Sequence, residues 1–418
     1  MDSKDDNILN GHRPMSLDDE FPGWEAQYWF EQEPNAFTAE SFEELLLHCA
    51  RKGASDITLQ TEEAVYAYVD GRNLRVTKHV LNSNEIEAIV NHIYGSGGVT
   101  FVRSGEEIDD RLPIVRRHPG VGNARGKIEK MNFRINVTGC WARGDDNGMQ
   151  ITARTIKSMP PTMAEMNVES AIVDAFFPEN GLVLVNGPTG SGKSTLLAAG
   201  VRSMVEDPDS HRKIITGEAP IEYTYDDVPR ASAIVSQHEI PRHVRSFARF
   251  VRNTLRRAPK VILVGESRDA ETVEATLEAA QTGHTVYSTL HTKSVPSTTT
   301  RMANMFPPSE RMTKLFEIID ALRLVVVQRL VRRADGKGRV PVREFLVFDQ
   351  TVRDHLRAAS SVREVEHILN KLVDKRGQSM LTSAQRLFDQ GIITIDQMNV
   401  FERESKADLI DDMDTSFA

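Results

Sequence analysis

The sequence predicts an α/β fold with a central parallel sheet, preceded by a smaller α+β domain and followed by C-terminal helices. Beyond residue 166, short apolar strands alternate with helical stretches, which is typical of a parallel sheet with helices on both faces. A glycine-rich turn joins the first of these strands to a helix, and Pro160 and Pro161 separate this region from a different pattern upstream. The expected segments are an acidic flexible tail (1–37), an N-terminal α+β domain (38–156), a linker (157–166), the α/β domain (167–350) and a C-terminal helical segment with an acidic tail (351–418).

The N-terminal region begins with an acidic tail for which we expect little regular structure. Residues 1–40 contain ten acidic and two basic side chains. An aromatic group interrupts this tail and either docks on a partner or packs on the chain's own body; its members are Trp24, Tyr28, Trp29 and Phe30. Apolar periodicity then predicts helices at 42–51 and 85–94 and strands at 64–69, 133–137 and 150–155.

Charge and composition indicate the cellular setting. The tails 1–40 and 402–418 carry net charges of −8 and −4, so the remaining residues carry +3 of the total of −9. No apolar run reaches the roughly 18 residues of a membrane span, and the first residues do not resemble a signal peptide. We therefore expect a cytoplasmic protein without a membrane span. Cys49 and Cys140 have no metal-ligand spacing and predict neither a disulfide framework nor a zinc site.

A phosphate-loop motif follows the predicted strand 182–185 and opens a helix. Its glycines permit the positive φ angles that turn backbone N–H groups inward, and the helix N-terminus adds a positive dipole, so the turn can cradle a phosphate. We expect Lys193 to reach the β and γ phosphates of ATP and the Ser194 hydroxyl to ligate Mg²⁺. The expected nucleotide-binding residues are Gly187, Pro188, Thr189, Gly190, Ser191, Gly192, Lys193, Ser194 and Thr195.

Two acidic residues follow later strands of the predicted sheet. Glu218 comes after strand 213–216, and Glu266 comes after the apolar strand 261–264. Because ligands bind at the carboxyl edge of open α/β sheets, we expect both carboxylates near the phosphates. Hydrolysis needs one acid to hold the hydration shell of Mg²⁺ and another to orient or deprotonate the attacking water, and we assign these tasks to Glu266 and Glu218 respectively. The alternative for each is a solvated loop acid.

Two histidines, His284 and His291, flank the predicted strand 285–288. Either imidazole could contact the γ-phosphate or connect one site to a neighbouring site, so both are catalytic candidates. A purely structural role is the alternative for each.

These motifs, in this order, resemble those of the secretion and pilus-retraction ATPase superfamily, in which a phosphate loop, an acidic box, a Gly-Glu pair and a His box recur. The resemblance covers about residues 40–400 and includes segments 54–59, 133–136 and 153–156 of the N-terminal domain. It implies a RecA-like P-loop ATPase domain, a PAS-like N-terminal domain and a homohexamer, in which the N-terminal domain of one subunit closes over the nucleotide of its neighbour. It also implies a cation supplied across that interface, for which Arg134 and Arg154 rank above Arg143.

Within the superfamily, segments 218–223, 235–243 and 265–272 are most similar to the branch that serves type IVB secretion and plasmid conjugation, represented by the DotB and TraJ ATPases. Pilus-retraction members have an aspartate where this chain has Ala219. The resemblance implies an Mg²⁺-dependent motor that energises secretion or conjugative transfer and is recruited to the inner membrane by proteins of that complex. A pilus retraction or assembly motor is the alternative, and a nucleotide-gated scaffold with little hydrolysis is another.

A group of arginines raises the question of nucleic-acid binding. They step by three and four residues and predict a basic stripe along one helix face; the group comprises Arg242, Arg245, Arg249, Arg252 and Arg256. Such a stripe could contact DNA phosphates. Because no aromatic side chains for base stacking interleave with it, we do not expect direct nucleic-acid binding. A solvated face or salt bridges to a neighbouring subunit would explain the stripe.

Overall fold

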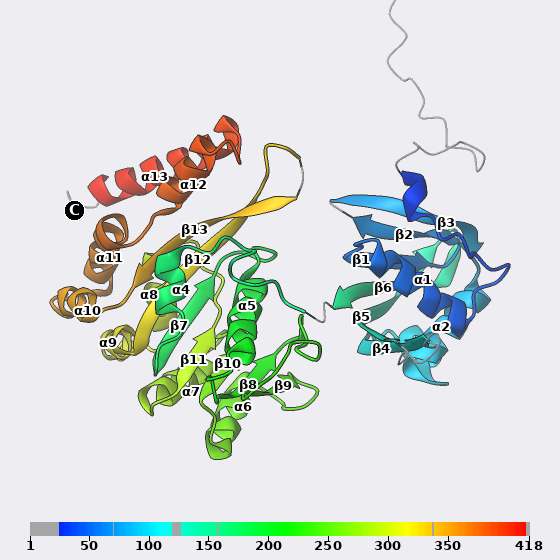
Figure 1. Cartoon of the computed structure of the whole chain (residues 1–418), viewed down its shortest axis with the longest axis horizontal. Coiled ribbons are helices and arrows are strands. Elements are labelled where there is room, and N and C mark those ends of the chain that lie inside the picture. Colours follow the sequence, from blue (N-terminus) through cyan, green and yellow to red (C-terminus); the bar gives the residue numbers. More distant parts are fainter. Residues whose placement is uncertain (1–24, 70, 119–126, 157–158, 337, 415–418) are drawn as a thin grey trace, which may run out of the picture. The chain divides into compact units, whose positions relative to one another are not determined.

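The computed structural model describes residues 25–69, 71–118, 127–156, 159–336 and 338–414 (Figure 1). The chain divides into two compact units, Met1–Ile156 (unit 1) and Lys157–Ala418 (unit 2). The predicted fold class, an α/β protein with a smaller domain before it and helices after it, is confirmed. No helix within the described residues is both long enough and apolar enough to cross a membrane.

Unit 1 is an antiparallel sheet with helices packed on one face. Its elements are η1 (Glu25–Tyr28), α1 (Ala39–Arg51), β1 (Asp56–Gln60), β2 (Glu63–Val69), β3 (Arg72–Leu81), α2 (Ser83–Tyr94), α3 (Gly98–Arg103), β4 (Ile108–His118), β5 (Lys127–Ala142) and β6 (Asp145–Ile156). Over the described residues the six strands have the order β3-β2-β1-β6-β5-β4. Helices α1 and α2 each begin with a capping box, at Thr38 and Asn82.

The core of unit 1 lies between the sheet and its helices. Ile57 of β1 and Phe133 of β5 belong to the buried cluster that also contains Phe42 of α1. Phe30 is in the same cluster, and the ring of Trp29 lies under the Lys78 ammonium group. The aromatic group therefore packs on the chain's own body where it is described; Trp24 lies outside the described residues.

Unit 2 is built on a mostly parallel sheet. Its elements are α4 (Ser170–Ala175), β7 (Gly181–Asn186), α5 (Lys193–Glu206), β8 (Lys213–Glu218), β9 (Ile234–Glu239), α6 (Phe247–Thr254), η2 (Leu255–Arg257), β10 (Val261–Val264), α7 (Ala270–Gln281), β11 (Thr285–Ser288), α8 (Val295–Ala303), α9 (Arg311–Ala321), β12 (Leu322–Arg332), β13 (Arg339–Val347), α10 (Gln350–Arg357), α11 (Val362–Arg376), α12 (Met380–Asp389) and α13 (Ile395–Asp414). The described strands have the order β13-β12-β7-β11-β10-β8-β9. Strand β13 is antiparallel to β12, and the other neighbours are parallel.

Helices cover both faces of this sheet, as predicted (Figure 1). Alternate residues of a strand point to opposite faces. In β7, Leu182 and Leu184 pack in a cluster with residues of α6 to α11, whereas Val183 and Val185 pack in a second cluster with residues of α4 and α5. The two clusters hold the strand ends, and therefore the loops that follow them, in fixed positions.

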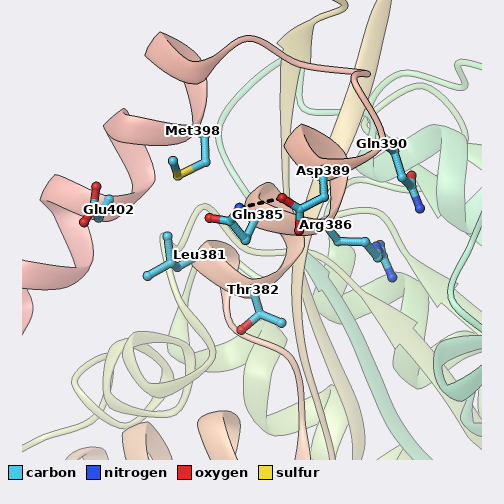
Figure 2. Close-up of a pocket in the computed structure, with 8 residues that line it drawn as sticks. All are labelled: Leu381, Thr382, Gln385, Arg386, Asp389, Gln390, Met398 and Glu402. Carbon is cyan, nitrogen blue, oxygen red and sulfur yellow. Dashed lines mark hydrogen bonds between the residues drawn. The ribbon is translucent and has the colours of Figure 1, made fainter.

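A third, smaller cluster joins β13 to the last two helices; it contains Val342, Ala384, Leu387, Ile393, Met398 and Phe401. A cavity of about 710 Å³ lies between α12 and α13 (Figure 2) and is lined by Leu381, Thr382, Gln385, Arg386, Asp389, Gln390, Met398 and Glu402. None of the predicted nucleotide-binding residues lines this cavity.

The predicted arginine stripe along one helix is wrong. Helix α6 begins at Phe247, where the Ser246 side chain caps it, and ends at Thr254. Arg242 and Arg245 therefore lie before the helix, and Arg256 belongs to the short η2 turn. The arginine spacing continues across Ser246 and by itself suggested one long helix, although serine is a favoured N-cap residue and caps α6 there. Within α6, Arg252 pairs with Glu271 at 2.7 Å.

Candidate active site

The phosphate loop connects β7 to α5 in the strand-to-helix turn that the sequence predicts. Gly187, Gly190 and Gly192 have φ angles of 139°, 73° and 85°, which non-glycine residues rarely adopt. A Cβ atom on Gly187 would lie 2.2 Å from the backbone oxygen of Gln328. Gly187 thus serves both backbone conformation and close packing on β12, while a Cβ on Gly190 would meet nothing within 4 Å.

Lys193 is held at the start of α5 by the loop itself. Its ammonium group donates hydrogen bonds to the carbonyl oxygens of Gly187 and Pro188, at 2.9 and 3.0 Å. Burial lowers the pKa of Lys193 from its usual value of 10.5, against an opposing effect of Glu266 and Glu222. The ammonium group is therefore poised beside the loop, where phosphate oxygens could replace the carbonyl acceptors.

The hydroxyl groups of the loop differ in their contacts. The Thr195 hydroxyl lies 3.1 Å from the Tyr223 hydroxyl, which ties α5 to the acidic segment after β8. Ser194 is half-buried in the first turn of α5. The Ser191 hydroxyl is buried and has no hydrogen-bond partner in the described part of the chain. Such a hydroxyl, beside glycines that leave room for a ligand, fits an anion bound in the loop.

The described residues contain no group of three or more His, Cys, Asp or Glu side chains that could hold a metal ion. This donor set still fits Mg²⁺, which in phosphate-loop sites takes a loop hydroxyl, phosphate oxygens and water rather than an all-protein cage. Ser194 and Glu266 are the residues available for that task.

Glu218 lies at the carboxyl end of β8 and is oriented by two donors. Its Oε1 atom accepts hydrogen bonds from the Thr216 hydroxyl at 2.6 Å and from the Gln237 amide at 3.2 Å. The same amide donates to the Tyr223 carbonyl oxygen at 2.9 Å. Strand β9, which carries Gln237, therefore fixes the direction of this carboxylate.

Glu266 and His291 lie together at the same sheet edge. Glu266 pairs with Arg268 at 2.7 Å, and its other oxygen lies 3.5 Å from Nε2 of His291. The loops that carry them are joined, since the Thr289 hydroxyl donates to the Gly265 carbonyl oxygen at 2.7 Å. The amide oxygen of Asn186, directly before the phosphate loop, accepts from the Leu290 N–H at 2.8 Å.

His284 lies at the opposite end of the parallel strands, where β11 begins. Strands β7 and β11 are parallel, with Thr285 opposite Gly181, so His284 is beside the start of β7 while the phosphate loop follows its end. The His284 ring lies 3.0 Å from the Ala279 carbonyl oxygen, near the end of α7. Within one chain, the structure brings His291 to the site and separates His284 from it.

Arg134 and Arg154 are direct partners on β5 and β6 of unit 1. Residues opposite each other in antiparallel strands point to the same face, so the two guanidinium groups share the sheet face that faces away from the core. Arg134 pairs with Asp109 at 2.6 Å and Arg154 with Asp56 at 2.7 Å. Arg143 lies apart from them in the β5–β6 turn, where it pairs with Glu63.

Comparison with known proteins decides the family. The protein-family model described as "Type II/IV secretion system protein" matches residues 31–400. The chain belongs to this family. The type IV pilus retraction ATPase PilT of Pseudomonas aeruginosa is 33% identical over 314 residues, which cover 75% of this chain and 84% of PilT.

Solved structures agree with this secretion-system family assignment. The crystal structure of the Legionella pneumophila ATPase DotB is 43% identical, with a TM-score of 0.80 over 90% of this chain and 98% of DotB. A crystal structure of the pilus retraction motor PilT with bound ADP is 28% identical, with a TM-score of 0.70 over 86% and 96% of the two chains. The predicted membership of the secretion and pilus-retraction ATPase superfamily is confirmed.

The sequence did not predict the side chains that orient the predicted site residues. Thr216 and Gln237 hold Glu218, and Asn186 joins the phosphate loop to the His291 loop. Gln328 contacts the phosphate loop directly, at Ser191. A signal for Gln328 existed, because it is an amide that directly continues the apolar run of β12.

Proposed function

We propose that the chain is an Mg²⁺-dependent ATPase that converts ATP into ADP and phosphate and couples this reaction to mechanical work. One observation carries the proposal: the phosphate loop with Lys193, the oriented carboxylate of Glu218 and the Glu266–His291 pair all follow carboxyl ends of strands in one sheet. Ligands bind at that edge in open α/β sheets.

The residues have distinct roles in this reaction. The loop N–H groups and Lys193 bind the phosphates, and Glu218 orients the attacking water and accepts its proton. Mg²⁺, held by Ser194 and through water by Glu266, would neutralise the negative charge of the phosphates. His291 lies beside Glu266 and is close enough to interact with that carboxylate. His284 is not assigned a role at the same subunit's site.

We further propose that the active assembly is a homohexamer in which arginines of unit 1 complete the nucleotide site of a neighbouring subunit. Charge on the transferred phosphoryl group calls for a cation. In the described parts of unit 2, Lys193 and Arg268 are cations near the loop, and arginines of a neighbouring unit 1 would add to them. The adjacent Arg134 and Arg154 lie on an exposed sheet face. Their surface ion pairs with aspartates are weak, so either guanidinium group could leave its aspartate and bind a phosphate instead.

The motor is proposed to act in the cytoplasm, recruited to the inner membrane by a type IVB secretion or conjugation complex. The likeness to DotB supports this system. The chain is 43% identical to DotB over 98% of the DotB chain, whereas its identity to the ADP-bound PilT structure is 28%. Ala219, in place of the aspartate of pilus-retraction members, supports it too. A pilus retraction or assembly motor is the second candidate, favoured by the curated pilus ATPases that the chain resembles.

The system can be tested in the native host by replacing Glu218 with Gln in the chromosomal gene. We expect loss of DNA or effector transfer with pilus-dependent motility unchanged. Loss of motility with normal transfer would instead support the pilus motor. If the purified variant no longer hydrolyses ATP and both processes continue, the motor proposal is wrong and a nucleotide-gated scaffold is correct.

A further inference from the structure

We infer that Gln328 and Arg343 are positioning residues for the phosphate loop and tie it to the chain segment that enters unit 2. The two residues lie on the paired strands β12 and β13, outside the loops described above. Gln328 is 0% exposed and Arg343 is 1% exposed. Neither belongs to the phosphate-loop motif, the acidic box or the His box.

Gln328 holds the loop at its centre. Its amide Nε2 atom donates to the carbonyl oxygen of Ser191 at 2.6 Å. Its backbone oxygen lies 2.2 Å from the position of a Cβ on Gly187, and its amide nitrogen lies 2.8 Å from the position of a Cβ on Gly192. The phosphate loop therefore packs directly on Gln328, and the direction of the loop N–H groups depends on the position of this residue.

Arg343 fixes which way the Gln328 amide points. The Arg343 Nε atom donates to Oε1 of Gln328 at 2.8 Å. A guanidinium group only donates, so the amide must turn its oxygen to Arg343 and its nitrogen to Ser191. A flipped amide would set two donors against each other and two acceptors against each other. Both residues thus act through another group and touch no substrate.

The other nitrogens of Arg343 hold segment 166–169, at the end of the expected linker. They donate to the carbonyl oxygens of Met166 and Asn167 and to the Glu169 carboxylate, at 3.0 to 3.1 Å. Glu169 also accepts from Arg386 at 2.6 Å. Burial raises the pKa of Glu169, but Arg343 and Arg386 outweigh it, and the pKa lies below its usual value. Arg386, shown in Figure 2, belongs to helix α12.

These contacts form one buried chain from Ser191 through Gln328 and Arg343 to Glu169. A displacement of the loop on nucleotide binding would therefore be transmitted through these hydrogen bonds to segment 166–169, and a displacement of that segment would be transmitted to the loop. This inference rests on the proposed function only in that the loop binds a nucleotide; it does not require hydrolysis.

The test compares Gln328→Met with Gln378→Met in the full-length protein. The Gln378 amide contacts Arg343 and Glu169 in the same network, at 2.9 and 3.3 Å, so it is a matched control away from the loop. The readouts are the melting temperature and the Kd for a fluorescent ADP analogue. We expect Gln328→Met to raise the Kd about tenfold, as loss of a buried hydrogen bond to the loop would. We expect Gln378→Met, which keeps the hydrogen bonds between Ser191, Gln328 and Arg343, to raise the Kd by clearly less.

Should Gln328→Met fail to fold, Gln328→Glu provides the second arm. The carboxylate keeps the side-chain volume and the contact with Arg343, yet presents no donor to the Ser191 carbonyl oxygen. We expect a stable protein with weakened ADP binding. Wild-type ADP affinity in either Gln328 variant, or an equal loss in Gln378→Met, would overturn the inference. Wild-type protein that binds ADP without hydrolysing ATP would contradict only the proposed function.

Discussion

At the scale of single residues, the depressed pKa of Lys193 predicts a pH dependence of nucleotide binding. Burial favours the neutral amine, so the pKa of Lys193 lies below 10.5 in the free protein. Bound phosphates favour the ammonium form and raise this pKa again. Binding therefore takes up a proton between the two values, and ADP affinity should fall as pH rises through that alkaline range. Isothermal titration calorimetry in buffers of different ionisation enthalpy measures the proton uptake.

Lys193→Arg is the control for this dependence. A guanidinium group stays charged throughout the same range, so the variant should bind ADP without pH-linked proton uptake. If wild-type protein binds ADP with no proton uptake at any alkaline pH below 10.5, the account of Lys193 is wrong.

The predicted site residues and the missed ones differ in the kind of information they need. Glu218 and Glu266 could be proposed from the sequence because each follows an apolar strand of a recognisable α/β pattern. Gln237 could not, since its contact with Glu218 depends on β9 pairing with β8 in one particular register. The separation of the two histidines was available in principle: one precedes and one follows a single strand, which places them at opposite edges of a parallel sheet.

At the scale of elements, the packing of β8 on α6 predicts that replacing Gly217 destabilises unit 2. A Cβ on Gly217 would lie 2.6 Å from the ring of Phe250, which is fully buried. We expect Gly217→Ala to lower the free energy of unfolding by about 1–3 kcal/mol and to reduce ATP turnover, because β8 carries Glu218. Urea unfolding measures the first effect.

Gly139→Ala is the matched change in another strand. A Cβ there would meet only the Val102 carbonyl oxygen, at 3.9 Å. We expect this variant to keep wild-type stability. Equal stability of the two alanine variants would contradict the described packing of β8 on α6.

Elements with strong apolar patterns were predictable, and those defined by long-range pairing were not. Strands β7, β8, β10 and β11 lie where the alternating pattern places them. Strands β12 and β13, which extend the sheet beyond β7, were missed because an antiparallel hairpin after several helices has no place in that pattern. The N-terminal unit extends further than expected, since Phe30 and Phe37 are buried in its core.

At the scale of the whole molecule, the proposed hexameric ring with shared sites predicts complementation between two inactive variants. A Glu218→Gln subunit still offers Arg134 and Arg154, and a subunit with both arginines replaced by Ala still offers Glu218. Random mixing would leave about a quarter of interfaces with both groups intact. We expect co-expressed mixtures to regain ATP turnover that neither variant shows alone. Turnover no higher than the sum of the two separate proteins would exclude arginines acting across the interface.

Steady-state ATP hydrolysis by Glu218→Gln tests the proposed chemistry most directly. The change keeps the shape of the side chain and removes the base, so we predict that kcat falls at least about 100-fold while ATP binding persists. Asp227→Asn, an exposed acid in the loop after β8, is the control and should keep wild-type turnover. Wild-type kcat in Glu218→Gln would contradict the central claim that Glu218 activates the water that attacks ATP.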